Sequence, residues 1–152
     1  MTDEWAENLD AIEDIIMVGY PNGIFDTTNN RPIVRKGITA SDPKIDYEGK
    51  RLFMADIACY YGSSGSPVLV YKKRMREVTA QHTRWFDVSK LIGIQCAMRI
   101  ASESSSTHDF VKFNMPLNLG RIIKAQCLYD FIPMIEKDYG VKIDASFTSA
   151  YT

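Results

Sequence analysis

The sequence is short of cysteine, and the three cysteines it has are far apart. Cys59, Cys96 and Cys127 form no Cys-x-x-Cys pair and have no histidine at zinc-ligand spacing. Disulfide frameworks and structural zinc sites depend on such spacings, so neither is indicated. We expect three buried thiols, no metal and no cofactor.

An excess of one charge and a long apolar run are also lacking. Lys and Arg number 18 and Asp and Glu 19, for a net charge of -1, which gives no electrostatic reason to bind nucleic acid or an anionic membrane. The longest apolar run, Leu91 to Met98, is too short to cross a bilayer, and the acidic start Thr2-Asp3-Glu4 does not resemble a signal peptide. At 152 residues and 45% hydrophobic content, we expect one soluble, cytoplasmic domain.

Short β-branched runs, each ended by turn residues, predict a mainly β fold. These runs are Ile15–Tyr20, Pro32–Ala40, Leu52–Ala58, Pro67–Tyr71, Leu91–Ala97 and Phe110–Met115. Their spacing of roughly ten residues is typical of a six-stranded antiparallel barrel. The polar stretch Lys72 to Lys90 is expected to be a solvated hairpin tip, with a substrate- or partner-binding flap as the alternative.

The pattern changes after the sixth run. Apolar residues then follow an approximately helical period: Leu119, Ile122, Ile123, Leu128, Ile132 and Ile135. We expect a helix capped by Asn118 and broken or kinked at Pro133. The domain organisation is then an acidic segment or linker over residues 1–14, a barrel with a closing helix over 15–140, and a tail over 141–152.

A Gly/Ser turn between two of the predicted strands has the features of a nucleophile loop. Gly62 and Gly65 flank Ser63 and Ser64, and Pro67 fixes the exit into the next strand. A serine nucleophile needs a sharp backbone that exposes its Oγ, and backbone N–H groups that stabilise the oxyanion. Glycine on both sides permits the positive φ that such a turn requires.

The hexapeptide Gly62-Ser63-Ser64-Gly65-Ser66-Pro67 resembles the nucleophile loop of trypsin-like (chymotrypsin-fold) serine peptidases. A second, independent match is Val18-Gly19-Tyr20-Pro21 followed by Arg35 to Ala40, which resembles the first two strands of the C-terminal barrel in bacterial members. The resemblance covers about Ile15 to Lys137 and implies a Greek-key barrel. It implies that Ser64 is the nucleophile and that Gly62 and Ser64 form the oxyanion hole.

The same resemblance implies a specificity pocket. Its floor would be Ala58 followed by Cys59, and its opposite wall would be Cys96, Ala97 and Met98. A floor without a carboxylate cannot pair a buried Lys or Arg side chain, so we expect a preference for small or medium apolar side chains.

The catalytic base is missing from the expected place. The family carries its His and Asp on a first barrel, whereas no histidine here precedes Ser64, and Asp56 does not match a triad member. His82 and His108 follow Ser64 in predicted loops, and either could act only in a rewired fold. Because losing the base costs roughly 10⁶ in turnover, we expect this chain alone to be inert toward peptides.

Three interpretations follow. The chain is the C-terminal half of a two-barrel endopeptidase, or a non-catalytic barrel that serves as a binding module, or an unrelated β-rich domain with a chance motif. A lone second barrel would expose an apolar surface, expected at Ile15 to Tyr20 and around Ala58 and Cys96. We therefore expect a homodimer, or exchange of the acidic N-terminal segment between copies.

Overall fold

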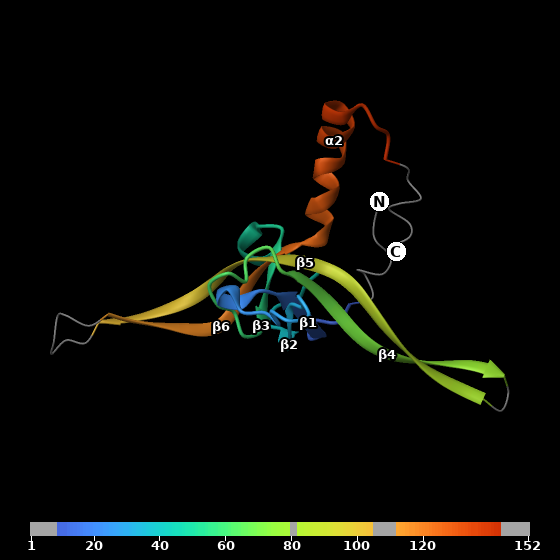
Figure 1. Ribbon diagram of the computed structural model, residues 1–152, viewed down its shortest axis with the longest axis horizontal. Coiled ribbons are helices and arrows are strands. Elements are labelled where there is room, and N and C mark those ends of the chain that lie inside the picture. Colours follow the sequence, from blue (N-terminus) through green and yellow to red (C-terminus); the bar gives the residue numbers. More distant parts are fainter. Residues whose placement is uncertain (1–8, 80–81, 105–111, 144–152) are drawn as a thin grey trace.

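A closed barrel of six antiparallel strands forms the centre of the molecule (Figure 1). The computed structural model describes residues 9–79, 82–104 and 112–143. The strands are β1 (Asp14–Gly19), β2 (Ile33–Thr39), β3 (Leu52–Asp56), β4 (Pro67–Thr79), β5 (His82–Ser104) and β6 (Lys112–Lys124). They pair in the order β1-β2-β3-β6-β5-β4, and β4 closes the barrel by pairing with β1. The predicted six-stranded antiparallel barrel with a C-terminal helix is confirmed.

The core is built from every second residue of the strands. Ile15 and Met17 of β1, Phe53 of β3, Val68 of β4 and Ile122 of β6 are all fully buried. Side chains fill the interior of a small barrel in this way. The apolar surface expected at Ile15 to Tyr20 is therefore wrong for these inward residues, because β1 lies between β2 and β4 and turns them into the core.

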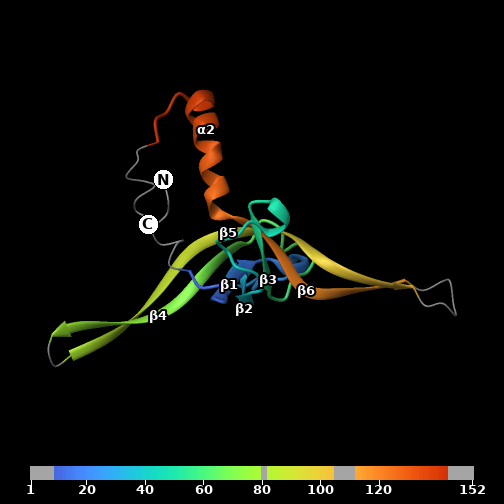
Figure 2. The ribbon, with the colours of Figure 1, turned by 180° about the vertical axis from the view of Figure 1, so that it is seen from behind.

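Two β-ribbons extend from the barrel in opposite directions (Figures 1 and 2). One consists of β4 and β5, whose pairing continues from Pro67 and Ile94 at the barrel to Thr79 and His82 at the far end. The other consists of β5 and β6, which remain paired as far as Ser104 and Lys112. The hairpin expected over residues 72–90 is present, and the residues of its tip, 80–81, lie outside the described part.

The helix predicted to start at Asn118 is wrong, because β6 continues as a strand to Lys124. Residues 119–123 pair with β3 over its whole length, and residues 120–124 also pair with β5. Gly120 and Ile122 face inward, and a Cβ on Gly120 would lie 2.7 Å from Cys59 Sγ. Asn118 has a φ of 56° and caps no helix. This stretch closes the barrel, and the hydrogen bonds to both neighbours override its helical spacing.

Helical structure begins seven to fourteen residues later than expected. A 3-10 helix, η3 (Ala125–Phe131), leads into α2 (Ile132–Tyr139), which ends at Gly140 with a φ of 63°. Pro133 lies in the first turn of α2, where its missing N–H costs no helical hydrogen bond, so it starts the helix instead of breaking it. Within the described residues, no helix is long and apolar enough to cross a membrane.

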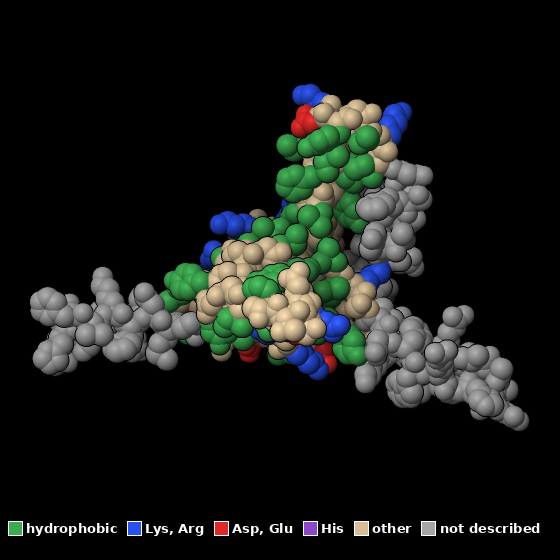
Figure 3. Space-filling model, in the orientation of Figure 1, with side chains coloured by type: hydrophobic (Ala, Val, Ile, Leu, Met, Phe, Trp, Pro, Cys, Tyr) green, Lys and Arg blue, Asp and Glu red, His purple; other side chains and the backbone are tan. Residues whose placement is uncertain are grey.

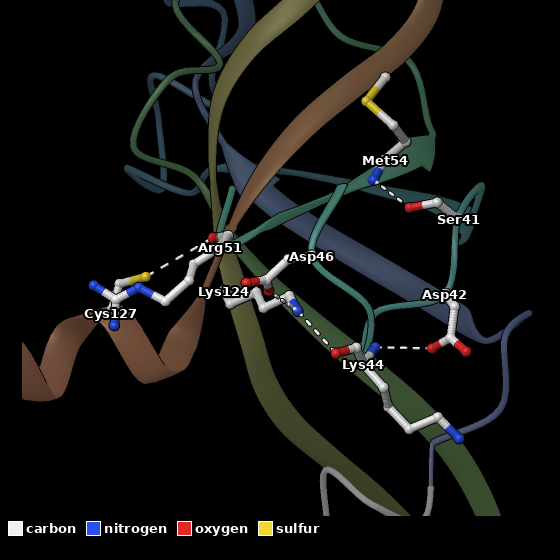
Figure 4. A network of polar contacts seen from close by, with 8 residues as sticks. All are labelled: Ser41, Asp42, Lys44, Asp46, Arg51, Met54, Lys124 and Cys127. Atoms are coloured by element: carbon white, nitrogen blue, oxygen red, sulfur yellow. Dashed lines mark hydrogen bonds and ion pairs between the residues drawn. The ribbon is translucent and has the colours of Figure 1, made fainter. Parts of the chain in front are cut away.

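Polar contacts fix the base of the helical segment to the barrel (Figure 4). Arg51 forms an ion pair with Asp130 and accepts a hydrogen bond from Cys127 Sγ at its carbonyl, 3.8 Å away. Lys124 is nearly buried, and its Nζ donates to the Lys44 carbonyl at 3.0 Å and to Asp46 Oδ1 at 2.6 Å. These contacts join the end of β6 to the loop before β3. Beyond them, α2 projects away from the barrel (Figures 1 and 2).

Candidate functional site

The Gly/Ser turn lies in the connection between β3 and β4, which crosses one end of the barrel. In the closed strand order, two strands separate β3 from β4 in either direction, namely β6 and β5 or β2 and β1. Residues 57–66 must therefore span from one side of the barrel to the other. The turn is thus held over the barrel end by its two flanking strands.

The backbone of the turn is fixed by hydrogen bonds to β5. Gly65 N donates to the Gln95 carbonyl at 2.8 Å, and Gln95 N donates to the Ser66 carbonyl at 2.9 Å. Ser66 N also donates to the Ser63 carbonyl at 3.1 Å. Gly62 and Gly65 have φ values of 79° and 87°, which glycine adopts without the strain of a side chain. The sequence correctly predicted glycine-dependent geometry at both positions.

Gly62 is also packed closely against the first loop of the barrel. A Cβ on Gly62 would lie 3.0 Å from the Tyr20 carbonyl oxygen and 3.1 Å from Asn22 N. Asn22 N donates to the Tyr61 carbonyl at 2.7 Å, and Asn22 itself has a φ of 51° in η1 (Pro21–Gly23). The turn is therefore held against Tyr20 and η1 as well as against β5.

Ser64 is exposed, and its Oγ donates to the Cys96 carbonyl at 3.3 Å. The N–H groups of Gly62 and Ser64 make no hydrogen bond within the described part of the chain. Gly62 and Ser64 are exposed residues, and an oxyanion hole requires backbone N–H groups that have no other partner. The arrangement leaves one hydroxyl and two donors available to a ligand.

Ser63, the neighbour of Ser64, faces the opposite way and is fully buried. Its Oγ accepts hydrogen bonds from Arg35 Nη2 at 3.1 Å and from Tyr60 N at 3.2 Å. Arg35 Nη1 donates to the Ala58 carbonyl at 2.5 Å. A guanidinium from β2 thus lies beneath the serine turn and joins Ala58 to Ser63.

Sequence reasoning did not identify Arg35 as part of the site, because the apolar residues of this run, Ile33, Val34 and Ile38, do not keep to one alternating set. In β2, the half-buried positions are Ile33, Arg35 and Gly37, and they alternate with exposed ones. The period of two therefore places Arg35 with the inward-facing residues. A charged residue at an inward position needs polar partners, and the serine turn supplies them.

The expected pocket residues are partly brought together. Cys96, Ala97 and Met98 are half-buried in β5, where a register irregularity between Gln95 and Ala97 brings the Cys96 carbonyl to Ser64. Ala58 is half-buried, with its carbonyl bound to Arg35, whereas Cys59 is fully buried in the core.

The thiols of the site are poor nucleophiles. Burial raises the pKa of Cys59, and the positive charge of Arg35 offsets this in part. Burial likewise raises the pKa of Cys96, and the positive charge of Arg121 offsets this only in part. Both thiols therefore stay protonated near neutral pH, and only the thiolate is reactive. The prediction of three buried thiols is confirmed for Cys59 alone, since Cys96 and Cys127 are half-buried.

A catalytic base is not found beside Ser64 among the described residues. His82 pairs with Thr79, twelve residues along β4 from Pro67, and a strand of that length spans about 40 Å. His108 lies outside the described part. No group of three or more His, Cys, Asp and Glu side chains suited to a metal ion occurs in residues 9–79, 82–104 and 112–143.

Comparison of the chain with protein-family models, with curated proteins and with solved structures found no match.

Proposed function

We propose that this chain is the nucleophile-bearing half of a trypsin-like serine endopeptidase. The observation that carries the proposal is the serine turn: Ser64 is exposed between two positive-φ glycines, with the N–H groups of Gly62 and Ser64 unpaired in the described structure. The strand order also supports it. The hairpins β4-β5 and β5-β6, with β3 returning beside β6, are the arrangement from which we infer a Greek key.

The proposed chemistry is acyl transfer at Ser64. Its Oγ attacks the peptide carbonyl carbon while a base accepts the hydroxyl proton, and the carbonyl oxygen becomes an oxyanion held by the N–H groups of Gly62 and Ser64. Collapse of this intermediate expels the amine, which takes the proton back from the base. Water then hydrolyses the acyl-enzyme by the same steps.

The base must come from outside the described part of this chain. His82 is too far from Ser64 along the β4–β5 ribbon. We propose that a second barrel supplies the histidine and its orienting acid, whether on the same polypeptide or on another. Without that second barrel, the chain is inactive toward peptides, because loss of the base costs roughly 10⁶ in turnover. The free thiols Cys59, Cys96 and Cys127 support a reducing, cytoplasmic setting for the assembled enzyme.

Imidazole in solution tests the proposal by replacing the missing base. A fluorophosphonate should label Ser64 very slowly in buffer, and added imidazole should accelerate the labelling about tenfold or more. Ser64→Ala should abolish the label, whereas Ser89→Ala, which removes an exposed serine of β5, should not. Labelling that imidazole leaves unchanged, or that appears on another serine, would contradict the proposal.

A second candidate is a non-catalytic barrel that binds a partner. It is favoured by one observation: within the described residues, the only partner of Ser64 Oγ is the backbone carbonyl of Cys96, and no base lies beside it there. The imidazole experiment separates the two functions, because a binding module has no reason to preserve a reactive serine. In that case, Ser64 should resist labelling at any imidazole concentration.

A further inference from the structure

Apolar side chains cover much of the segment formed by η3 and α2 (Figure 3). Phe131, Met134 and Tyr139 are 53%, 58% and 77% exposed, and the set of exposed apolar residues also includes Leu128, Tyr129 and Ile135. We call these six residues the apolar helix surface. A soluble monomer rarely presents such a group of large apolar side chains along one short segment.

The segment has little support of its own. Among the described elements, α2 contacts chiefly η3. At its base, η3 contacts β5 and is held to the barrel through Arg51, Asp130 and Cys127. A helix of eight residues is marginal in water without packing. Its charged residues, Glu136, Lys137 and Asp138, are confined to the outer half. Packing against another surface would therefore stabilise this helix.

We propose that the apolar helix surface pairs with the same surface of a second copy of this chain. At the exposed fractions found, the six side chains present roughly 600 Å² per copy. A two-fold contact that covers most of this area on both copies buries about 1,000 Å², the lower bound for a specific interface. Two-fold contacts join identical patches, and they are the commonest association of soluble chains.

The proposed interface differs from the one expected from the sequence. The inward residues of β1 are buried in the barrel, so they cannot form a dimer contact. None of the six residues belongs to the serine turn, which lies between β3 and β4. Dimer formation and reactivity of Ser64 are therefore separate properties, and each can fail without the other.

Sedimentation velocity and light scattering of the full chain at micromolar concentration test the pairing. We expect a dimer, and the combined variant Met134→Lys and Tyr139→Lys should raise the dissociation constant about a hundredfold or more, because it puts charges into the contact. The matched control is Ile24→Lys with Val34→Lys, which changes two exposed apolar residues of similar exposure outside the segment. This control should remain a dimer.

A cysteine variant keeps the test independent of any loss of helix structure. Met134→Cys, in a background with Cys96 and Cys127 changed to Ser, should cross-link two copies under a short bismaleimide, whereas Val34→Cys in the same background should not. A monomer in both hydrodynamic measurements, or equal cross-linking at both positions, would overturn the proposal. So would a dimer that survives the double lysine variant with its helix intact.

Discussion

The serine turn depends on two side chains, the exposed Ser64 and the half-buried Arg35. Ser64 is directed outward, and Arg35 holds the turn from inside through Ser63 Oγ and the Ala58 carbonyl. The Arg35 Nε atom is buried and has no partner in the described structure. Burial of the guanidinium therefore costs desolvation free energy. Its hydrogen bonds to Ala58 and Ser63 fix the path of the chain between these two residues.

Arg35→Met should loosen the turn. The change leaves the Ala58 carbonyl without its donor and removes one of the two donors to Ser63 Oγ, so the free energy of unfolding should fall by about 1–3 kcal/mol. Urea unfolding measures the loss, and amide hydrogen exchange should quicken at Ser63 and Ser66, whose N–H groups close the turn.

Lys36→Met is the matched control, since Lys36 is the next residue of β2 and forms an exposed ion pair with Asp14. An exposed pair contributes only about 0–1 kcal/mol, and exchange within the turn should not change. Equal effects of the two substitutions on the turn amides would show that Arg35 does not position it.

At the scale of elements, a comparison of the two turn glycines distinguishes the cost of backbone strain from the cost of a steric clash. Gly62 and Gly65 both have positive φ, but only Gly62 has atoms within 4 Å of a would-be Cβ. Alanine at positive φ costs about 1–2 kcal/mol at either site. Gly62→Ala should therefore destabilise the protein more than Gly65→Ala does, by about 1 kcal/mol or more, because Tyr20 and Asn22 must also move.

Thermal unfolding of both variants measures this difference, and Ser64 labelling in imidazole reports the effect on the site. The Gly62→Ala variant should label more slowly than the Gly65→Ala variant, since its turn must leave Tyr20 and η1. If Gly65→Ala is the more damaging change in both measurements, the contact between Gly62 and the first loop does not fix the turn.

The sequence predicted the first strands well because their local signals agree with the fold. In β1 and β3, β-branched or apolar runs end at turn residues, and both strands were found where predicted. The prediction for residues 119–124 was wrong because their apolar spacing suits a helix, although Gly120 and Ile122 also alternate as a strand requires. Only pairing with β3 and β5, which are distant in sequence, decides between the two.

At the scale of the whole molecule, closure of the barrel determines which side chains are buried and which lie on the surface. The strand order turns Ile15 and Met17 inward and places the serine turn across one end. Single-sequence patterns do not encode strand order, so the sequence predicted the positive φ values of Gly62 and Gly65 but placed apolar surface on Ile15 and Met17, which are buried. They also do not show where β4 and β5 leave the barrel, so the length of the ribbon could not be predicted.

The arrangement around Ala58 leads to a prediction about substrate preference, within the proposed function. Peptide probes bearing a phosphonate warhead should label Ser64 faster with Ala or Val beside the phosphorus than with Lys or Arg, by about tenfold or more. The predicted pocket floor, Ala58, has no carboxylate, and its carbonyl already accepts a hydrogen bond from the Arg35 guanidinium. A second cation brought there would be buried without a counter-charge, which costs several kcal/mol.

The labelling rates should be compared in the same concentration of imidazole, so that the base is equal for all probes. Ser64→Ala controls for reaction elsewhere, and a probe with glycine at the same position gives the rate without a side chain. Because all probes share one warhead, their rate ratios report the pocket and not the chemistry. If the Arg probe reacts fastest, a carboxylate outside the predicted floor must face the bound side chain, and Ala58 does not determine the specificity.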